Sequence, residues 1–271
     1  MKARSATVLC SIGSTDPSGA AGLGADLRVF AHLGAVGVCV VTGVSAQNSA
    51  RVLSVGEIAP KLVTQQLQAI WHQVRPDAVC VGLVPGAAAL AAVERFLRRC
   101  QPRPPIVVDP VISASSGRRF LGARELRALR RLLTIATVVT PNLSEAAALT
   151  GDRVATLAQA EGAARLLAAG GCAALVTGGH LAGRACVDVL AAPGSRRRGG
   201  AQRGVVLRRF AAPRLAGTMR GAGGILAAAL AVELGRGERL EQAVMRARTF
   251  VRRAHRSARP LGSGLPQFLA L

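Results

Sequence analysis

The sequence predicts an α/β fold of three layers, with helices on both faces of a central, mostly parallel sheet. Short apolar runs that suit buried strands alternate along the 271 residues with longer segments of helical periodicity. The runs are apolar nearly throughout, as expected of strands that are covered on both faces. Neither a linker-like change of composition nor an internal repeat interrupts the alternation, so we expect one domain over residues 1–271.

The first half of the chain is predicted to consist of successive strand–helix units. Apolar runs rich in Val, Leu, Ile and Cys predict strands at 6–13, 36–43, 77–84 and 105–111. Apolar residues at spacings of three and four predict helices at 21–34, 61–74, 87–100 and 123–136. Helical crossovers of this kind connect parallel strands.

The second half continues the alternation and then changes at one point. Strands are expected at 137–141 and 172–179, and helices at 142–151 and 157–170. Two further apolar runs, at 186–192 and 204–210, are close enough in sequence to form an antiparallel hairpin. Two helices, at 221–235 and 238–256, complete the predicted fold.

Composition excludes several classes of protein. No apolar run reaches the length of a membrane span, and the apolar run near the N-terminus is too short for a secretory signal. The six cysteines form no CxxC pair and no ligand spacing with histidine, which argues against a zinc site or a disulfide framework. Cys10, Cys39 and Cys80 lie inside apolar runs and are expected in the core. We expect a soluble, cytoplasmic protein without membrane contact.

The charge is strongly basic. The formal net charge is +21, and of the 35 basic residues only Lys2 and Lys61 are lysines. Residues 189–232 contain eight arginines and no acidic residue. Such a surface attracts phosphate-bearing ligands, either a nucleotide or a nucleic acid. Aromatic residues make up 3% of the chain and tyrosine is absent, so base stacking is poorly supplied and nucleic acid is not the expected partner.

Polar segments follow the predicted strands, at the edge of the sheet where α/β proteins bind ligands. They are rich in Gly, Ser, Thr, Asn and Asp, and comprise "GSTDPSGAAGLGAD", "TGVSAQN", "GLVPG", "DPVISASSG", "TPNLSE" and "TGGHLAG". A further segment, "LAGTMRGAGGILAAALA" at 215–231, runs into a helix through Gly221, Gly223 and Gly224. Unpaired N–H groups at such a helix start bind anions, although a tight turn against a sheet has the same composition.

These segments carry a resemblance to a known family. "STDPSGAAGLGADLRVFAHLGAVG", "SAQN", "VVDPVISASSG", "TPNLSEAAALTG", "LVTGGHL", "DVL" and "LGSGLP" occur in an order that resembles the hydroxymethylpyrimidine and phosphomethylpyrimidine kinases of thiamine biosynthesis. These enzymes belong to the ribokinase-like superfamily, near the pyridoxal kinases. The resemblance implies a ribokinase-like fold, a small aminopyrimidine substrate, ATP with Mg²⁺, and a homodimer.

The resemblance also implies roles for individual residues. Asp26 and Gln47 fall where the family holds the aminopyrimidine, Leu83 where it packs against the ring, and Ser14 where a glycine contacts the substrate. The remaining positions concern the nucleotide and the reaction. Asn142 and Glu145 correspond to positions near magnesium and the phosphates, with Glu145 acting on Mg²⁺ indirectly; Thr177 and Gly179 belong to the nucleotide site; and Arg220, Gly221, Ala222, Gly223 and Gly224 align with the anion hole.

Five positions depart from the family's pattern, one of them Ser14, which replaces the substrate-contacting glycine. The family's presumed base, a cysteine or aspartate, is Gly224 here, and its histidine is Arg220. Two lysines are replaced by Ser115 and Thr177. Three hypotheses therefore stay open at this stage: a kinase whose activity is weakened, a catalytically inactive relative that binds a pyrimidine or nucleotide, and a basic nucleic-acid-binding protein on a kinase scaffold. The choice among hydroxymethylpyrimidine, its phosphate and pyridoxal is open as well.

Overall fold

The computed structural model describes residues 6–48, 51–114, 117–194, 204–262 and 264–268. The strands that it contains are β1 (Val8–Thr15), β2 (Val36–Gln47), β3 (Val52–Glu57), β4 (Ala78–Val81), β5 (Ile106–Val108), β6 (Val138–Val139), β7 (Ala173–Val176), β8 (Ala185–Ala192) and β9 (Val206–Pro213). The helices are α1 (Gly22–His32), α2 (Pro60–Gln73), α3 (Ala87–Arg99), α4 (Ala123–Leu133), α5 (Leu143–Thr150), α6 (Leu157–Ala169), α7 (Ala222–Gly235) and α8 (Leu240–Ser257).

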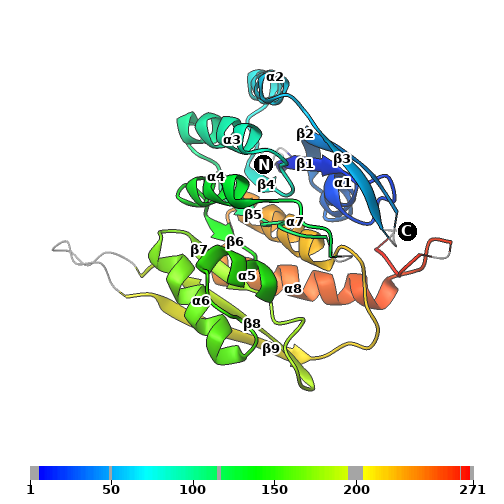
Figure 1. Ribbon diagram of the computed structural model, residues 1–271, viewed down its shortest axis with the longest axis vertical. Helices are drawn as coiled ribbons and strands as arrows, with labels where there is room; N and C mark the ends of the chain where they lie inside the picture. Colours follow the sequence, from blue (N-terminus) through cyan, green and yellow to red (C-terminus); the bar gives the residue numbers. More distant parts are fainter. Residues whose placement is uncertain (1–5, 49–50, 115–116, 195–203, 263, 269–271) are drawn as a thin grey trace, which may run out of the picture.

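All of these strands belong to one nine-stranded sheet of order β3-β2-β1-β4-β5-β6-β7-β8-β9 (Figure 1). The strands from β2 to β7 in this order pair in parallel. β3 joins one edge in antiparallel orientation, and the β8–β9 hairpin extends the other edge. The predicted mostly parallel sheet and the predicted hairpin are both confirmed.

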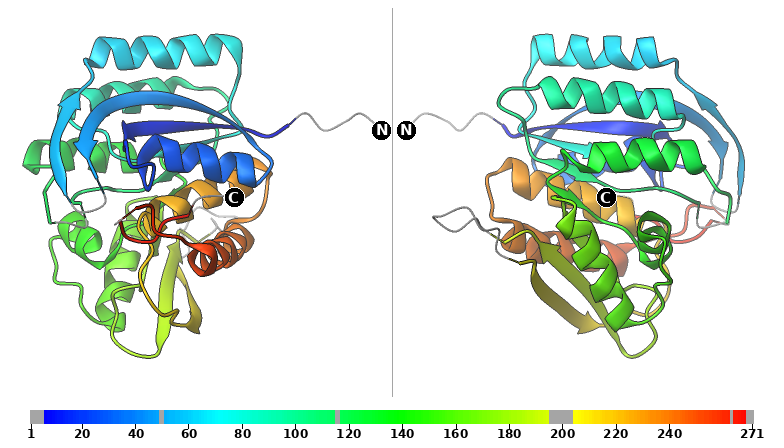
Figure 2. Two further views of the ribbon diagram at one scale, coloured as in Figure 1. Left: turned by 90° about the vertical axis from the view of Figure 1, so that its right-hand side faces the viewer. Right: turned by 60° about the vertical axis from the view of Figure 1, so that its left-hand side comes forward.

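Helices cover both faces of the sheet, as Figures 1 and 2 show. One face packs against α2, α3, α4, α5 and α6, and the other against α1, α7 and α8. The alternation of side chains along β1 illustrates the arrangement, because Cys10 and Ile12 join the first core and Leu9 joins the second. The three-layer α/β/α prediction is confirmed.

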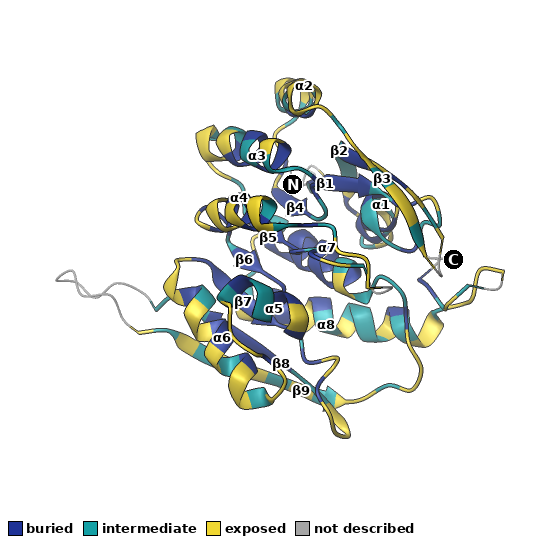
Figure 3. Ribbon diagram, in the orientation of Figure 1, coloured by how far each residue is buried: buried dark blue, intermediate teal, exposed yellow. Residues whose placement is uncertain are grey.

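Helix α7 is the most deeply buried of the described helices (Figure 3). Its residues 225–234 are all buried, between the sheet and the neighbouring helices α1 and α8. A helix that is apolar all round belongs in the interior of a protein. The helix packs against β4 and β5, with Gly235 at its end beside Ala78 at the start of β4 and Gly224 beside Asp109, which follows β5. The glycine-rich start of α7 therefore lies at the carboxyl ends of these strands.

The sequence prediction was wrong in the region of β2 and β3. β2 extends to Gln47 instead of ending at residue 43, and β3 was not predicted. Both errors have the same cause, since this edge of the sheet is half exposed and its strands mix polar and apolar residues instead of forming apolar runs. Cys10 and Cys80 are buried as predicted, but Cys39 on β2 is only partly buried.

No helix in the described ranges is both long enough and apolar enough to cross a membrane.

Candidate active site

The loop after β1 is folded around the carboxylate of Asp16. That carboxylate accepts hydrogen bonds from the backbone N–H of Ser18 (2.9 Å), the hydroxyl of Ser18 (2.7 Å) and the backbone N–H of Ala21 (3.1 Å). The loop in turn lies against the start of α7. A Cβ atom at Gly221 would be 2.0 Å from the carbonyl oxygen of Ala20, and Gly221 has a φ of 77°. The residue at 221 must therefore be glycine for the two segments to meet.

The first turn of α7 is open. No side chain caps this helix, and its N-cap residue is Gly221. The backbone N–H groups of Ala222, Gly223 and Gly224 consequently have no partners within the helix, and the helix dipole adds positive potential at the same place. Gly223 is exposed. The arrangement suits a phosphate group, as the glycine content of the segment suggested.

A cavity of about 370 Å³ adjoins this helix start. Asn142, Thr177 and Gly179, which the sequence assigned to nucleotide binding, line it together with Ala222 and Gly223. Its apolar lining comes from Leu215, Met219, Leu226 and Val251. Polar backbone at one side and apolar side chains at the other are typical of a small-molecule site.

An arginine clamps the glycine-rich turn that borders this cavity. The guanidinium of Arg214 donates to the carbonyl oxygens of Gly179 (2.5 Å), Leu181 and Gly183 (3.0 Å). The same turn is held from the other side by Asp188, whose carboxylate accepts from the backbone N–H of Gly178 at 2.7 Å. The cavity wall is therefore fixed by hydrogen bonds at several points.

Asn142 and Glu145 cap helix α5 reciprocally. The Asn142 side chain accepts from the backbone N–H of Glu145 at 3.0 Å, and the Glu145 carboxylate accepts from the backbone N–H of Asn142 at 2.9 Å. One carboxylate oxygen of Glu145 is thus committed to the cap. Burial raises the pKa of Glu145 to about 7, although hydrogen bonds from backbone N–H groups oppose the shift.

These donors can be compared with what Mg²⁺ requires. Among the described residues, no group of three or more His, Cys, Asp or Glu side chains is placed to hold a metal ion. A site without such a group fits Mg²⁺ that is bound chiefly by phosphate oxygens and water, which is how this ion commonly binds at nucleotide sites.

The four residues assigned to the pyrimidine lie around the carboxyl ends of β1, β2 and β4. Ser14 donates its hydroxyl to the carbonyl oxygen of Leu83 at 3.0 Å, so these two are in direct contact. Asp26 is buried on α1 and accepts a hydrogen bond of 2.6 Å from the Ser11 hydroxyl. Gln47 is the last residue of β2, and its side chain forms no hydrogen bond to the other three in the described part of the chain.

Burial raises the pKa of Asp26 to about 7, and the hydrogen bond from Ser11 opposes this shift. A second buried carboxylate, Asp109, lies nearby at the end of β5 and was not singled out from the sequence. A Cβ atom at Gly224 would lie 3.7 Å from Oδ2 of Asp109 and 4.0 Å from Oδ1 of Asp26. The only sequence signal for Asp109 was its place directly after a buried strand, within "DPVISASSG".

Comparison with known proteins identifies the family. The sequence model of the family described as "Phosphomethylpyrimidine kinase" matches residues 16–267. This chain belongs to the phosphomethylpyrimidine kinase family. The hydroxymethylpyrimidine/phosphomethylpyrimidine kinase of Rhizobium meliloti is 35% identical over 261 residues, which cover 95% of this chain and 93% of that protein. The enzyme of that name from Mycobacterium leprae is 37% identical over 259 residues, covering 94% of this chain and 90% of that protein.

Solved structures of the family and its neighbours have the same fold. The phosphomethylpyrimidine kinase of Clostridium difficile matches with a TM-score of 0.77 at 26% identity, over 92% of this chain and 99% of that one. An ADP complex of the Bacillus subtilis pyridoxal kinase matches with a TM-score of 0.84 at 27% identity, over 97% of each chain. The ribokinase-like fold that the sequence implied is confirmed.

The departures from the family's pattern can now be located. Gly224 lies in the first turn of α7, and Thr177 lies on the wall of the cavity. Arg220 precedes the helix, and its backbone N–H donates to the carbonyl oxygen of Pro266 at 2.8 Å. Ser115, which replaces a family lysine, lies outside the described residues.

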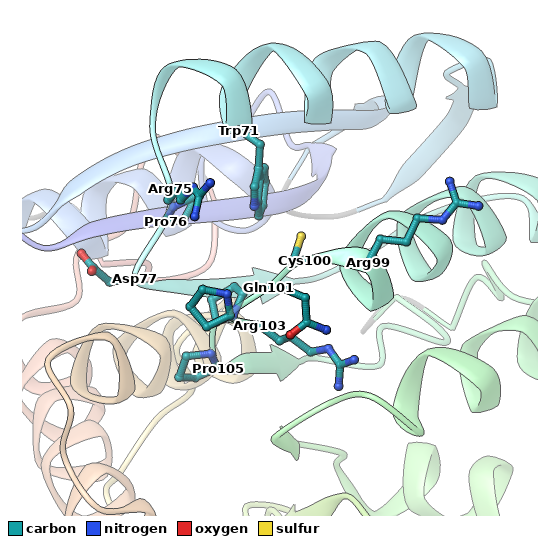
Figure 4. A pocket seen from close by; sticks show the side chains of 11 residues that line it. Trp71, Arg75, Pro76, Asp77, Arg99, Cys100, Gln101, Arg103 and Pro105 are labelled. Carbon is teal, nitrogen blue, oxygen red and sulfur yellow. The ribbon is translucent and has the colours of Figure 1, made fainter.

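Figure 4 shows a second cavity, of about 660 Å³. Several of its lining residues directly precede β4 and β5, so it adjoins the amino ends of these strands, away from the predicted site residues at the carboxyl ends. It is bordered by the end of α2 and by the segment that connects α3 with β5. In Figure 4 the Cys100 thiol points toward Trp71, and the Arg99 side chain extends away from them. None of the site residues that were predicted from the sequence lines this second cavity.

Proposed function

We propose that this protein is an ATP-dependent kinase that phosphorylates hydroxymethylpyrimidine and its phosphate in thiamine biosynthesis. The family match over residues 16–267 and the full-length relatives of that name support the activity. The structural observation that carries the proposal is the position of the first turn of α7. Gly223 borders the cavity, and Gly224 faces the carboxylates on the substrate side, so one helix start adjoins both candidate binding regions.

In this proposal ATP occupies the cavity of about 370 Å³. Its base packs on the apolar lining, and its phosphates extend toward the start of α7, where Ala222, Gly223 and Gly224 present unpaired N–H groups. Asn142, Thr177 and Gly179 contact the nucleotide from the opposite wall. Phosphoryl transfer depends mainly on positioning and on stabilisation of charge, and this arrangement supplies both.

Mg²⁺ would be held by the phosphates, with Glu145 reaching it through water, and it would neutralise charge that develops on the β- and γ-phosphates. Arg220 supplies additional positive charge at the helix start, although a guanidinium does not take the place of a lysine ammonium in detail.

The pyrimidine binds on the other side of α7 in this proposal. Asp26 and Gln47 bind its polar edge, and Leu83 packs on the ring. Ser14 shapes the pocket through its hydrogen bond to the Leu83 carbonyl. The acceptor oxygen is thereby directed toward Gly224, where it lies next to the phosphate site that the first turn of α7 forms.

A coupled assay of ADP release tests this function, with hydroxymethylpyrimidine, its phosphate and pyridoxal offered separately. We expect turnover with the first two. A test variant is Gly223→Val, because Gly223 borders the cavity at the helix start and a larger residue there should raise the KM for ATP. Calorimetric binding of the pyrimidine without ADP release from any substrate would contradict the proposal and identify a non-catalytic relative.

We also propose that the protein acts in the cytoplasm as a homodimer. Val44 on β2 and Leu53 on β3, at the edge of the sheet, are 52% and 57% exposed, and exposed apolar side chains of this kind can contact a second copy of the chain. Sedimentation equilibrium tests the assembly. A monomer at micromolar concentration would contradict it.

A further inference from the structure

Asp109 is a buried carboxylate without a hydrogen-bond donor. It is 9% exposed, at the carboxyl end of β5, and its side chain accepts no hydrogen bond from any residue in the described ranges. Other buried carboxylates of this protein are partnered. Asp26 is bonded by Ser11, and Asp188 is bonded by the backbone of Gly178. The oxygens of Asp109 are not among the fully buried side-chain atoms that lack a partner in the described ranges, so this carboxylate keeps access to solvent and is free to accept a proton.

The position of the Asp109 carboxylate indicates its function. Oδ2 of Asp109 lies 4.0 Å from the position that a Cβ atom would take at Gly223, and 3.7 Å from that position at Gly224. Gly223 borders the nucleotide cavity. Gly224 occupies the position at which relatives are presumed to carry the base. The Asp109 carboxylate therefore lies beside the place where a side-chain base at 224 would project.

We infer that Asp109 is the catalytic base of this enzyme, an inference that rests on the proposed kinase activity. Asp109, at the end of β5, takes the role of proton acceptor that residue 224 on helix α7 is presumed to have in relatives. The O–H bond of the substrate's hydroxymethyl group breaks, and its proton passes to Oδ2 of Asp109. The alkoxide oxygen forms a bond to the γ-phosphorus of ATP. The bond from that phosphorus to the bridging oxygen breaks, and its electron pair leaves with ADP. Asp109 returns the proton to solvent as the products leave.

Asp109 suits this role better than Asp26 does. Oδ2 of Asp26 already accepts a hydrogen bond from the Ser11 hydroxyl. Oδ1 of Asp26 lies 4.0 Å from the Cβ position at Gly224, slightly farther than Oδ2 of Asp109. Burial, with smaller contributions from the carboxylates of Glu145 and Asp26, raises the pKa of Asp109 well above its usual value. Such a carboxyl group accepts a proton strongly once it is ionised, so the rate should rise with pH as Asp109 loses its own proton. Cys80 on β4 also faces this group, and burial raises the pKa of that thiol.

The two substrates of the proposed reaction differ in their need for a base. Hydroxymethylpyrimidine presents a hydroxyl group, which must lose its proton. Its phosphate presents a phosphate oxygen, and a phosphate monoester with a second pKa of about 6 is already largely ionised at neutral pH. A catalytic base therefore affects the first phosphorylation far more than the second, whereas a residue that binds magnesium or ATP affects both.

The test compares single-turnover rates of Asp109→Asn on the two substrates at saturating ATP and magnesium. We expect the rate with hydroxymethylpyrimidine to fall by about 10²–10⁴-fold, which is the usual contribution of a general base. The rate with its phosphate should change less than threefold, and calorimetry should show unchanged binding of the pyrimidine. Asp152→Asn removes the same charge at an exposed position and serves as the matched control.

A second variant tests transfer of the base to helix α7. When Gly224→Cys is added to Asp109→Asn, the rate with hydroxymethylpyrimidine should rise at least tenfold above that of Asp109→Asn alone, because a thiolate is favoured at a helix start. Gly224→Ala fills the same space without a base and should recover nothing. Asp109→Ala provides a further check should the asparagine variant fold poorly, since formate can occupy the vacated space and should restore its rate while chloride at equal ionic strength does not.

Each remaining outcome overturns one specific claim. A parallel loss on both substrates, or recovery of Asp109→Asn at high magnesium concentration, would overturn the assignment of Asp109 as base in favour of phosphate or metal binding. An unchanged rate with hydroxymethylpyrimidine would overturn it as well. Absence of turnover in the unmodified enzyme on both pyrimidines would overturn the proposed function itself, and the role of Asp109 with it.

Discussion

The guanidinium of Arg248 on helix α8 lies 2.7 Å from the carboxylate of Asp188 on strand β8, and the two side chains are only 13% and 9% exposed. The other carboxylate oxygen of Asp188 holds the backbone of Gly178, next to the nucleotide cavity. Arg248 also lies over the ring of Phe210, 5.6 Å from its centroid. This ion pair connects α8 with the cavity wall.

We predict that Arg248→Met lowers the free energy of unfolding by roughly 3 kcal/mol, because it leaves a buried carboxylate without its cation. Urea denaturation measures the effect. Arg208 is a matched control, since its pair with Glu241 has side chains that are 61% and 57% exposed, and Arg208→Met should cost less than about 1 kcal/mol. Equal losses in the two variants would contradict the prediction.

The pH dependence of stability should reveal Asp26. Burial raises its pKa from 3.8 to about 7, so between these pH values the folded protein keeps a proton that the unfolded chain has lost. Its contribution to stability is complete below about pH 4 and is lost as the pH rises through about 7.

Asp26→Asn should therefore make the decline of unfolding free energy over this pH range less steep, by up to about 1.4 kcal/mol per pH unit. Part of the decline should remain, since the pKa values of Glu145 and Asp109 are raised as well. Chemical denaturation at a series of pH values measures the slope, with Asp152→Asn as the exposed control. An identical slope in Asp26→Asn and in the unmodified protein would argue against a raised pKa.

Two glycines of the same helix start should respond oppositely to alanine. Gly221→Ala should destabilise the protein strongly, because its Cβ atom would meet the Ala20 carbonyl oxygen at 2.0 Å and its φ is positive. Gly224→Ala should stabilise it by up to about 1 kcal/mol, since Gly224 is helical and its Cβ atom would make ordinary contacts. Thermal and urea denaturation compare them. Similar effects at both positions would show that the start of α7 is arranged differently.

Thr177→Lys should strengthen nucleotide binding. Thr177 lines the cavity, and its hydroxyl makes a long 3.5 Å contact with the Pro141 carbonyl, so little is lost by replacing it. A charge-assisted hydrogen bond contributes about 1.5–3 kcal/mol, which predicts a decrease in the Kd for ATP of roughly tenfold or more. Thr177→Met has a similar length without the charge and should not improve binding. A gain that persists unchanged at high salt would not be electrostatic.

The basic surface should not bind nucleic acid tightly. We expect ATP binding with mild salt dependence and only weak, non-specific DNA binding at physiological salt. Fluorescence anisotropy over a salt series tests both. Tight DNA binding with a steep log–log salt slope would contradict the assignment of positive charge to nucleotide binding. Arg196, Arg197, Arg198 and Arg203 of the arginine-rich segment lie outside the described residues.

The parts of the fold that the sequence predicted well are those with strong periodicity. Amphipathic helices such as α4 have apolar residues at spacings of three and four, and buried strands such as β4 are short apolar runs that alternate with these helices. β3 was missed because an edge strand covered on one side has no comparable pattern. The rule that ligands bind at carboxyl ends of strands correctly brought Asn142, Thr177 and Gly179 to one cavity.

The sequence did not indicate Asp109, because an aspartate before proline is also ordinary turn chemistry. Its significance depends on the absence of a donor and on the distance to Gly224, and both are properties of three-dimensional packing. The contact of Ser14 with the Leu83 carbonyl was hidden for the same reason, since it joins residues 69 positions apart.

The contrast between Gly221 and Gly224 bears on how this site can evolve. Gly221 is fixed by the backbone, so any change there disturbs the scaffold. Gly224 has ordinary helical geometry and its Cβ position would make only ordinary van der Waals contacts, so a small side chain can be gained or lost there without rearrangement of the backbone. On the proposed assignment of Asp109, the side chain at residue 224 can therefore change during evolution while the fold and a proton acceptor are both kept.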